Sequence, residues 1–190
     1  FRSVVLLLAW FAWRRPSGAI PAVALAGLAI YLLHQGEEHW IDALGRHFAF
    51  QTFANAQVAR LLPDVAVPGA PLTPLAIFTI NVGVWLMALQ GVASRPGDAF
   101  PLTAGVAATL VNGVTHAAAA LALGIYNPGL VTAVALFLPL SAWALAWLVR
   151  AGHATLPHVA VAMAWAICLH AILIGSTVAA NVYGLIPEVP

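Results

Sequence analysis

The run AIPAVALAGLAIYLLHQGEEHWIDAL, residues 19–44, decides the fold of this 190-residue chain. Its first part, residues 19–33, holds no charged side chain, and a helix that crosses a bilayer needs about 20 mostly apolar residues. The run then turns polar, with His34, Glu37 and Glu38 inside the same predicted helix. It therefore predicts a membrane-spanning helix that carries ionisable groups into the lipid and whose last turns emerge from it.

The rest of the chain repeats the apolar pattern of this first segment. Hydrophobic residues make up 63% of the sequence and charged residues 7%, against roughly 25% charged residues in soluble domains. We therefore expect an all-α fold, a polytopic transmembrane helical bundle that forms a single integral-membrane domain. Breaks rich in Pro, Gly and charge separate about five predicted spans, which cover residues 19–44, 72–93, 100–123, 130–149 and 156–182.

Two further segments are apolar without fitting a span. In residues 45–62, apolar side chains such as Phe50 and Phe53 recur at helical spacing between polar ones. This pattern predicts an amphipathic helix that lies along the membrane surface and partly covers the mouth of any cavity beneath it. Residues 4–13 are too few to cross a bilayer, so they predict a partial N-terminal helix or an interfacial anchor.

Charge limits the partners and sets the orientation. The net charge is +1 and no basic run exists, which gives no basis for nucleic-acid binding. One set of loops carries more arginine than the other, and the richer set is expected in the cytoplasm. We therefore expect an integral protein of the bacterial inner (plasma) membrane, with its cytoplasmic side marked by Arg14, Arg15, Arg95 and Arg150 and its outer side by Arg46 and Arg60.

Polar residues in three other spans lie at nearly the same depth as His34. At about 1.5 Å rise per residue, each lies roughly 11–16 residues from the predicted cytoplasmic end of its helix. Ionisable groups in hydrocarbon cost a few kcal/mol each, so by default they indicate a functional site. The residues that share this layer with His34 are Asn81, Asn112, His116 and His170.

The spacing of the polar residues favours a metal site. His34, Glu37 and Glu38 stand at i, i+3 and i+4, on one face of a helix. Two adjacent carboxylates cannot both stay ionised in a dry bundle without a cation, so a metal ion or a shared proton is expected. We predict that one or two ions of Zn or Fe are bound by His34, Glu38, His116 and His170, with Glu37 as catalytic base and Asn81, Asn112 and His39 as supporting residues.

These residues resemble the signature of the HXXEE family of small multi-span membrane proteins. The family pattern is a His-x-x-Glu-Glu motif, another histidine and a Tyr-x-Pro-Gly motif. The first is matched by residues 34–38, the second by His116, and the third by residues 126–129, which on their own are typical of a tight turn. The resemblance covers nearly the whole chain; it supports the extent of the site and implies no particular reaction.

Three functions are compatible with the sequence. The first is an integral-membrane metal-dependent enzyme, of hydrolase or oxidase type, that acts on a lipid-soluble small substrate. The second is a metal-free proton-relay or transport protein that uses the same Glu/His cluster. The third is a non-catalytic accessory subunit of a membrane complex. The expected partners are membrane lipid and an apolar small molecule, and both a homo-oligomer and a larger complex stay open.

Overall fold

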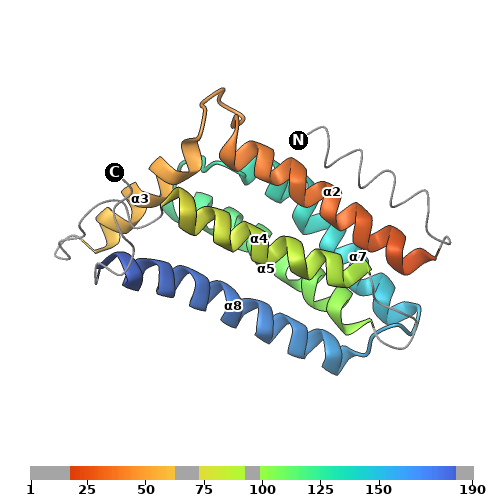
Figure 1. Cartoon of the computed structure of the whole chain (residues 1–190). Helices are drawn as coiled ribbons and strands as arrows, with labels where there is room; N and C mark the ends of the chain where they lie inside the picture. Colours follow the sequence, from red (N-terminus) through yellow and green to blue (C-terminus); the bar gives the residue numbers. More distant parts are fainter. Residues whose placement is uncertain (1–17, 63–72, 93–98, 183–190) are drawn as a thin grey trace.

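A computed structural model shows a bundle of long helices (Figure 1). The structure describes residues 18–62, 73–92 and 99–182. These ranges contain no strand, only an isolated antiparallel bridge between Ile41 and His47. The helical elements are α2 (Ala19–His39), α3 (Ala49–Leu61), α4 (Pro74–Val92), α5 (Phe100–Leu123), α6 (Leu130–Thr132), η1 (Ala133–Phe137), α7 (Leu138–Arg150) and α8 (Leu156–Val182).

The predicted all-α bundle is confirmed. Four helical segments of the described chain are long and apolar enough to cross a membrane: α2, α5, the continuous stretch Leu130–Arg150, and α8. The remaining predicted span is the helix α4, which contributes the apolar stretch Pro74–Gly83. The predicted partial helix at residues 4–13 lies outside the described residues.

The first two helices are shorter than the sequence predicted. We expected the first to reach residue 44, but α2 ends at His39, and the chain turns back through the Ile41–His47 bridge. The amphipathic helix was expected from residue 45, but α3 begins at Ala49, after Phe48 in a left-handed conformation with φ of 52°. Apolar periodicity cannot foresee such a turn, because Asp42 builds it from local hydrogen bonds.

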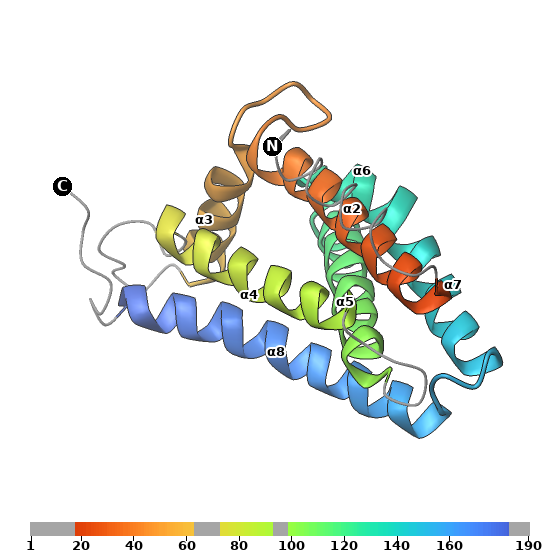
Figure 2. The same cartoon turned by 45° about the vertical axis from the view of Figure 1, so that its right-hand side comes forward.

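Helix α5 is the centre of the bundle. It packs against α8, α4 and α7, and α2 packs chiefly against α4. Figures 1 and 2 show the long helices running roughly along one axis, with α3 crossing one end of the bundle beside the end of α2. Among the described residues α4 and α8 scarcely contact each other, although both lie against α5.

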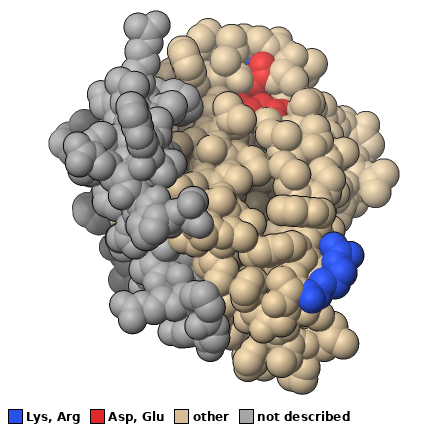
Figure 3. Space-filling model, turned by 90° about the vertical axis from the view of Figure 1, so that its right-hand side faces the viewer, with Lys and Arg blue, Asp and Glu red and all other residues tan. Residues whose placement is uncertain are grey.

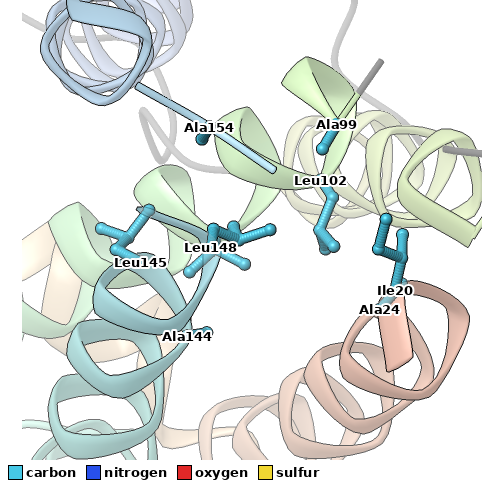
Figure 4. Packing of buried hydrophobic residues seen from close by; sticks show 9 residues of the cluster. Ile20, Ala24, Ala99, Leu102, Ala144, Leu145, Leu148 and Ala154 are labelled. Carbon is cyan, nitrogen blue, oxygen red and sulfur yellow. The ribbon is translucent and has the colours of Figure 1, made fainter. Parts of the chain in front are cut away.

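The end of the bundle remote from α3 has an apolar core. Ile20 and Ala24 of α2, Leu102 of α5, and Leu145 and Leu148 of α7 are buried there (Figure 4). Lipid tails are as apolar as these side chains, so close van der Waals packing, rather than the hydrophobic effect, holds such helices together.

A π-helical turn, η1, interrupts the Leu130–Arg150 helical stretch next to the polar layer. Pro139 follows it, and proline supplies no N–H to the preceding turn, which accounts for irregular helix geometry here. Gly113 lets α5 approach closely, because a Cβ there would lie 3.1 Å from Phe137 Cβ and 3.0 Å from Leu138 Cδ2. The result is that Phe137, fully buried, points into the bundle at the level of His34.

The surface agrees with a membrane setting. Large apolar side chains such as Leu121, Phe78 and Ile172 are well exposed on α5, α4 and α8. Figure 3 shows the face at one end of the bundle, on which the charged atoms of the described residues form small, separate patches. Apolar side chains exposed on several helices at once are what contact with lipid tails requires.

Candidate metal centre

The last turns of α2 and the second half of α5 bring three ionisable side chains together. His34 and Glu38 lie one turn apart on α2, and His116 of α5 faces them. Glu38 Oε1 lies 3.4 Å from His34 Nε2 and 3.1 Å from His116 Nε2. Among the described residues this is the group of three or more ligand-type side chains whose ligand atoms all lie within 4.8 Å of one another. His34 is fully buried and the other two nearly so.

Hydrogen bonds on the far side of His34 assign its tautomer. Its Nδ1 lies 2.9 Å from Thr132 Oγ1. The single hydroxyl proton of Thr132 is donated to Glu37 Oε2 at 2.6 Å, so His34 Nδ1–H must donate to Thr132. In neutral His34 the lone pair is then on Nε2, which is buried and has no hydrogen-bond partner in the described chain.

His116 is oriented in the same way by Asn127. The amide of Asn127 donates from Nδ2 to the backbone oxygen of His116 at 3.0 Å, which fixes the amide orientation. Its Oδ1 then accepts from His116 Nδ1 at 2.6 Å. Neutral His116 therefore also presents an unprotonated Nε2 toward Glu38.

Three electron-pair donors thus converge: two imidazole Nε2 atoms and one carboxylate oxygen. Without a cation between them their lone pairs repel, and burial makes that repulsion costly. Ligand atoms held tetrahedrally about 2.0–2.1 Å from a zinc ion are roughly 3.3 Å apart. The distances of 3.4 and 3.1 Å from Glu38 Oε1 fit that geometry. Histidines whose Nδ1–H is held by an oxygen are also the usual form of metal-ligating histidine.

Glu37 serves a different purpose from its neighbour. Its Oε1 accepts from the Tyr126 hydroxyl at 2.8 Å and the Val131 N–H at 3.0 Å. Its Oε2 accepts from the N–H and the hydroxyl of Thr132 at 2.7 and 2.6 Å. Glu37 therefore satisfies the first free N–H groups of the Leu130–Arg150 helical stretch, which have no partner within a helix. It also holds the Thr132 hydroxyl that orients His34.

Gly129 closes the site from the side of the α5–α6 turn. Its φ is 91°, which favours glycine. A Cβ at this position would lie 2.8 Å from Glu38 Cγ, from His34 Cε1 and from His116 Cε1. The glycine of the Tyr-x-Pro-Gly motif is therefore needed for its space as well as for its backbone conformation.

A second network ties the loop after α2 to the same turn. The Tyr126 hydroxyl accepts the Ala43 N–H at 3.1 Å, and the Arg46 guanidinium lies over the Tyr126 ring. Burial, together with the neighbouring Glu37 carboxylate, raises the pKa of Tyr126, so it remains a hydrogen-bond donor. Burial opposes ionisation of Asp42, but hydrogen bonds from the backbone and side chain of Arg46 and from the backbone of Leu44 lower its pKa below the usual 3.8.

A cavity of about 270 Å³ lies beside the cluster; we call it the site cavity. Glu38 and His116 line it together with His39, whose Nε2 is 3.5 Å from Glu38 Oε2 and 3.3 Å from Asn81 Nδ2. Phe50 of α3 stacks edge-on against the His39 ring at 5.2 Å, so α3 covers part of this cavity. Most of the remaining wall is apolar, from Phe53, Ile77, Ile80, Leu169, Leu173 and Ile174.

The structure brings together most of the residues that the sequence singled out. His34, Glu38 and His116 form the cluster, whereas His170 lines the site cavity outside it and bonds through Nδ1 to the Ala166 oxygen at 2.8 Å. Of the predicted supporting residues, His39 and Asn81 are in mutual contact, and Asn112 lines the cavity with a buried Oδ1 that lacks a partner among described residues.

Sequence reasoning missed the residues that orient the ligands. Tyr126 and Asn127 read as a tight turn, and only the Tyr-x-Pro-Gly resemblance could have indicated that this turn belongs to the site. Thr132 carried no signal, because a single threonine in an apolar segment is common in membrane helices. Gln35, which donates to Glu38 Oε2 at 2.9 Å, was also missed.

The family model described as "Protein of unknown function with HXXEE motif" matches residues 25–144, more than half of the chain. The protein belongs to the HXXEE family. Neither the curated proteins nor the solved structures contain a match to this chain. The matched range includes His34, Glu37, Glu38, His116 and the turn at residues 126–129.

Proposed function

We propose that this HXXEE protein is an integral-membrane metal-dependent enzyme whose metal is held by His34, Glu38 and His116. The observation that carries the proposal is the convergence of two oriented Nε2 atoms on Glu38 Oε1 in a buried place. Two histidines and one carboxylate, with a fourth position left open, are a donor set of catalytic zinc sites. The nitrogen and oxygen donors suit iron equally well.

Glu38 and His116 of this donor set line the site cavity, so a molecule in the cavity would reach a metal that they hold. When bound, zinc would supply Lewis-acid activation of water, and iron would supply oxidation chemistry. His39 lies on the cavity wall beside Glu38 Oε2 and is placed to exchange a proton with a molecule in the cavity. A base at Glu37, the residue predicted from the sequence, would first have to give up its four hydrogen bonds.

The cavity walls favour an apolar small substrate that arrives from the membrane. Ile77 and Ile80 of α4 line one side and Leu173 and Ile174 of α8 the other, and these two helices scarcely contact each other. A lipid-soluble molecule can therefore approach between α4 and α8. The buried Asn112 Oδ1 offers a hydrogen-bond acceptor for a polar group on that molecule.

The proposal is tested by measuring the metal content of the full chain purified in detergent after growth with both zinc and iron. We expect close to one ion per chain in the wild-type protein and loss of it in His116→Ala. His158→Ala is the matched control, since His158 is exposed at the start of α8, outside the cluster, and its replacement should leave the metal in place.

The proton-relay alternative uses the same cluster and makes a different prediction. In that case the cation shared by Glu38 and the two histidines is a proton, and the purified wild-type protein contains no stoichiometric metal. A metal-free protein that also fails to take up added zinc or iron would overturn the metalloenzyme proposal. It would leave the relay or the accessory-subunit function.

A further inference from the structure

A second cavity of about 270 Å³ lies in the apolar part of the bundle, between α2, α5 and α7. Its lining holds no charged side chain, and the polar groups in it are few. Of these, the Tyr31 hydroxyl is already bonded to Asn81 Oδ1 at 2.6 Å, and Thr109 Oγ1 to the Gly105 oxygen at 3.0 Å. Such a wall can bind hydrocarbon but offers little to a polar ligand.

The second cavity and the site cavity follow one another along the same two helices. On α2 the second cavity is lined by residues 22–31, and the site cavity begins at Tyr31 and runs to His39. On α5 the second cavity is lined by residues 101–109 and the site cavity by residues 108–119. The two spaces are therefore arranged end to end along the bundle, and together they reach the roughly 300–1,000 Å³ typical of small-molecule sites.

Two aromatic rings stand where the cavities meet. Tyr31 and Phe137 line both cavities, and their rings are stacked with centroids 6.3 Å apart and planes 2° apart. Phe137 also packs on His34, at 4.2 Å between ring centroids. The two rings therefore form a shared wall between the cavities, next to the ligand His34. The core residues Ala24, Leu102 and Ala144, which Figure 4 labels, line the part of the second cavity remote from the cluster.

We propose that the second cavity binds the hydrocarbon tail of a substrate whose polar head lies at the His34–Glu38–His116 cluster. The inference rests on the proposed function, and it narrows the substrate class to amphiphiles with one small polar head and a long apolar chain, such as a fatty acyl or isoprenoid compound. Glycines provide the space for the tail, because a Cβ at Gly27 or Gly105 would meet no atom within 4 Å.

The test uses the full chain in detergent and a series of alkyl hydroxamates with hexyl, decyl and tetradecyl chains, whose heads chelate metal. Gly27→Leu fills the second cavity from α2, and Gly105→Leu fills it independently from α5. Gly175→Leu is the matched control, because Gly175 is exposed on α8 and its Cβ would also meet no atom. We expect either filled variant to bind the tetradecyl compound about tenfold more weakly, as if a few methylenes were displaced, and to bind the hexyl compound like wild type.

A metal-independent probe separates this inference from the proposed function. A long-chain fatty alcohol with a diazirine near its tail should label residues of α2 or α5 that line the second cavity, less so in Gly27→Leu and equally in Gly175→Leu. If this labelling were found in a protein that contains no metal, it would support binding of the tail in the second cavity although the metalloenzyme proposal would have failed. Two results together would contradict tail binding in the second cavity and leave the proposed metal centre unaffected. The first is a hydroxamate affinity that changes no more in Gly27→Leu than in Gly175→Leu. The second is labelling of residues outside the second cavity.

Discussion

The two ends of the α2–α5 pair differ in the side chains that they bring together: apolar side chains at one end and ionisable ones at the other. At one end, Ile20 and Ala24 pack on Leu102 without any polar contact between the helices. At the other, His34 and Glu38 face His116, and the Nδ1 atoms of the two histidines are bonded to Thr132 and Asn127. The apolar end loses little when one contact changes, whereas an unpaired polar group in a membrane interior costs several kcal/mol.

This difference indicates what each end contributes. The apolar end provides van der Waals packing and space, and its alanines and glycines leave room for a second cavity. The polar end is held in one arrangement by the hydrogen bonds of Thr132 and Asn127 to the Nδ1 atoms of the two histidines. Substitutions at the polar end should therefore change metal binding, stability or both, and substitutions at the apolar end should leave metal binding unchanged.

The sharpest contrast within the polar end is between the adjacent residues Glu38 and Glu37, and it carries the largest expected effects. Glu38→Gln removes an anionic ligand and should weaken metal binding by more than the roughly 10–100-fold typical of an outer-shell change. Glu37→Gln should instead lower the melting temperature, because its amide N–H₂ must face a backbone N–H that is left unsatisfied at about 1–3 kcal/mol. Metal titration and thermal unfolding of both variants measure the loss of metal affinity and the loss of stability separately. Equal metal loss in both, at unchanged stability, would make both carboxylates ligands.

Two glycines with positive φ test how tightly the turn packs on the ligands. Gly129 has φ of 91° and Gly124 has φ of 66°, but a Cβ would meet the three ligand residues only at Gly129. Gly124→Ala should cost only the strain of a left-handed alanine, roughly 1–2 kcal/mol. Gly129→Ala should cost more and also release metal. If Gly124→Ala and Gly129→Ala had the same melting temperature and the same metal content, this packing would be contradicted.

The Thr132 hydroxyl should have a smaller effect, because it acts on the metal only through His34. Thr132→Val keeps the shape of the side chain but removes the acceptor of His34 Nδ1–H and a donor to Glu37. We expect metal affinity to fall about 10–100-fold, and Thr132→Ser, which keeps the hydroxyl, to restore most of it. Wild-type affinity in the valine variant would show that the tautomer of His34 is set in another way.

The smallest effect is expected at Asp42, in the loop that joins the polar end to α3. Because its pKa is lowered in the folded state, ionised Asp42 stabilises the fold above its unfolded pKa near 3.8, and this contribution is lost as the pH falls through the lower folded value. Wild-type protein should therefore lose more thermal stability than Asp42→Asn as the pH falls below about 4. Parallel acid curves for the two proteins would contradict the assigned pKa direction.

Much of this arrangement was predictable from sequence, and the physical reason differs between its parts. The long spans follow from apolar composition, and the cluster on α2 follows from the i, i+4 spacing of His34 and Glu38. Depth counting also paired His116 with His34, but it placed His170 in the same layer without showing that its side chain lies apart from the cluster. Depth is a one-dimensional quantity, whereas ligand contact depends on helix rotation, which the tertiary packing sets.

The role of Glu37 could not be read from sequence for a related reason. Its partners, Tyr126, Val131 and Thr132, are about 90 residues away, and a helix N-terminus is a ligand for a carboxylate only once the two helices are packed. The sequence separated the two adjacent glutamates into a metal ligand, Glu38, and a catalytic base, Glu37. It could not show that Glu37 accepts hydrogen bonds from the start of the Leu130–Arg150 stretch.

The central claim is that one ion binds His34, Glu38 and His116, and X-ray absorption at the metal edge of the purified full-length protein tests it most directly. We expect stoichiometric zinc or iron whose spectrum shows two imidazole nitrogens and oxygen ligands at about 2.0–2.2 Å, and whose imidazole contribution falls to one in His116→Ala. A protein without stoichiometric metal, or an unchanged spectrum in that variant, would contradict the claim.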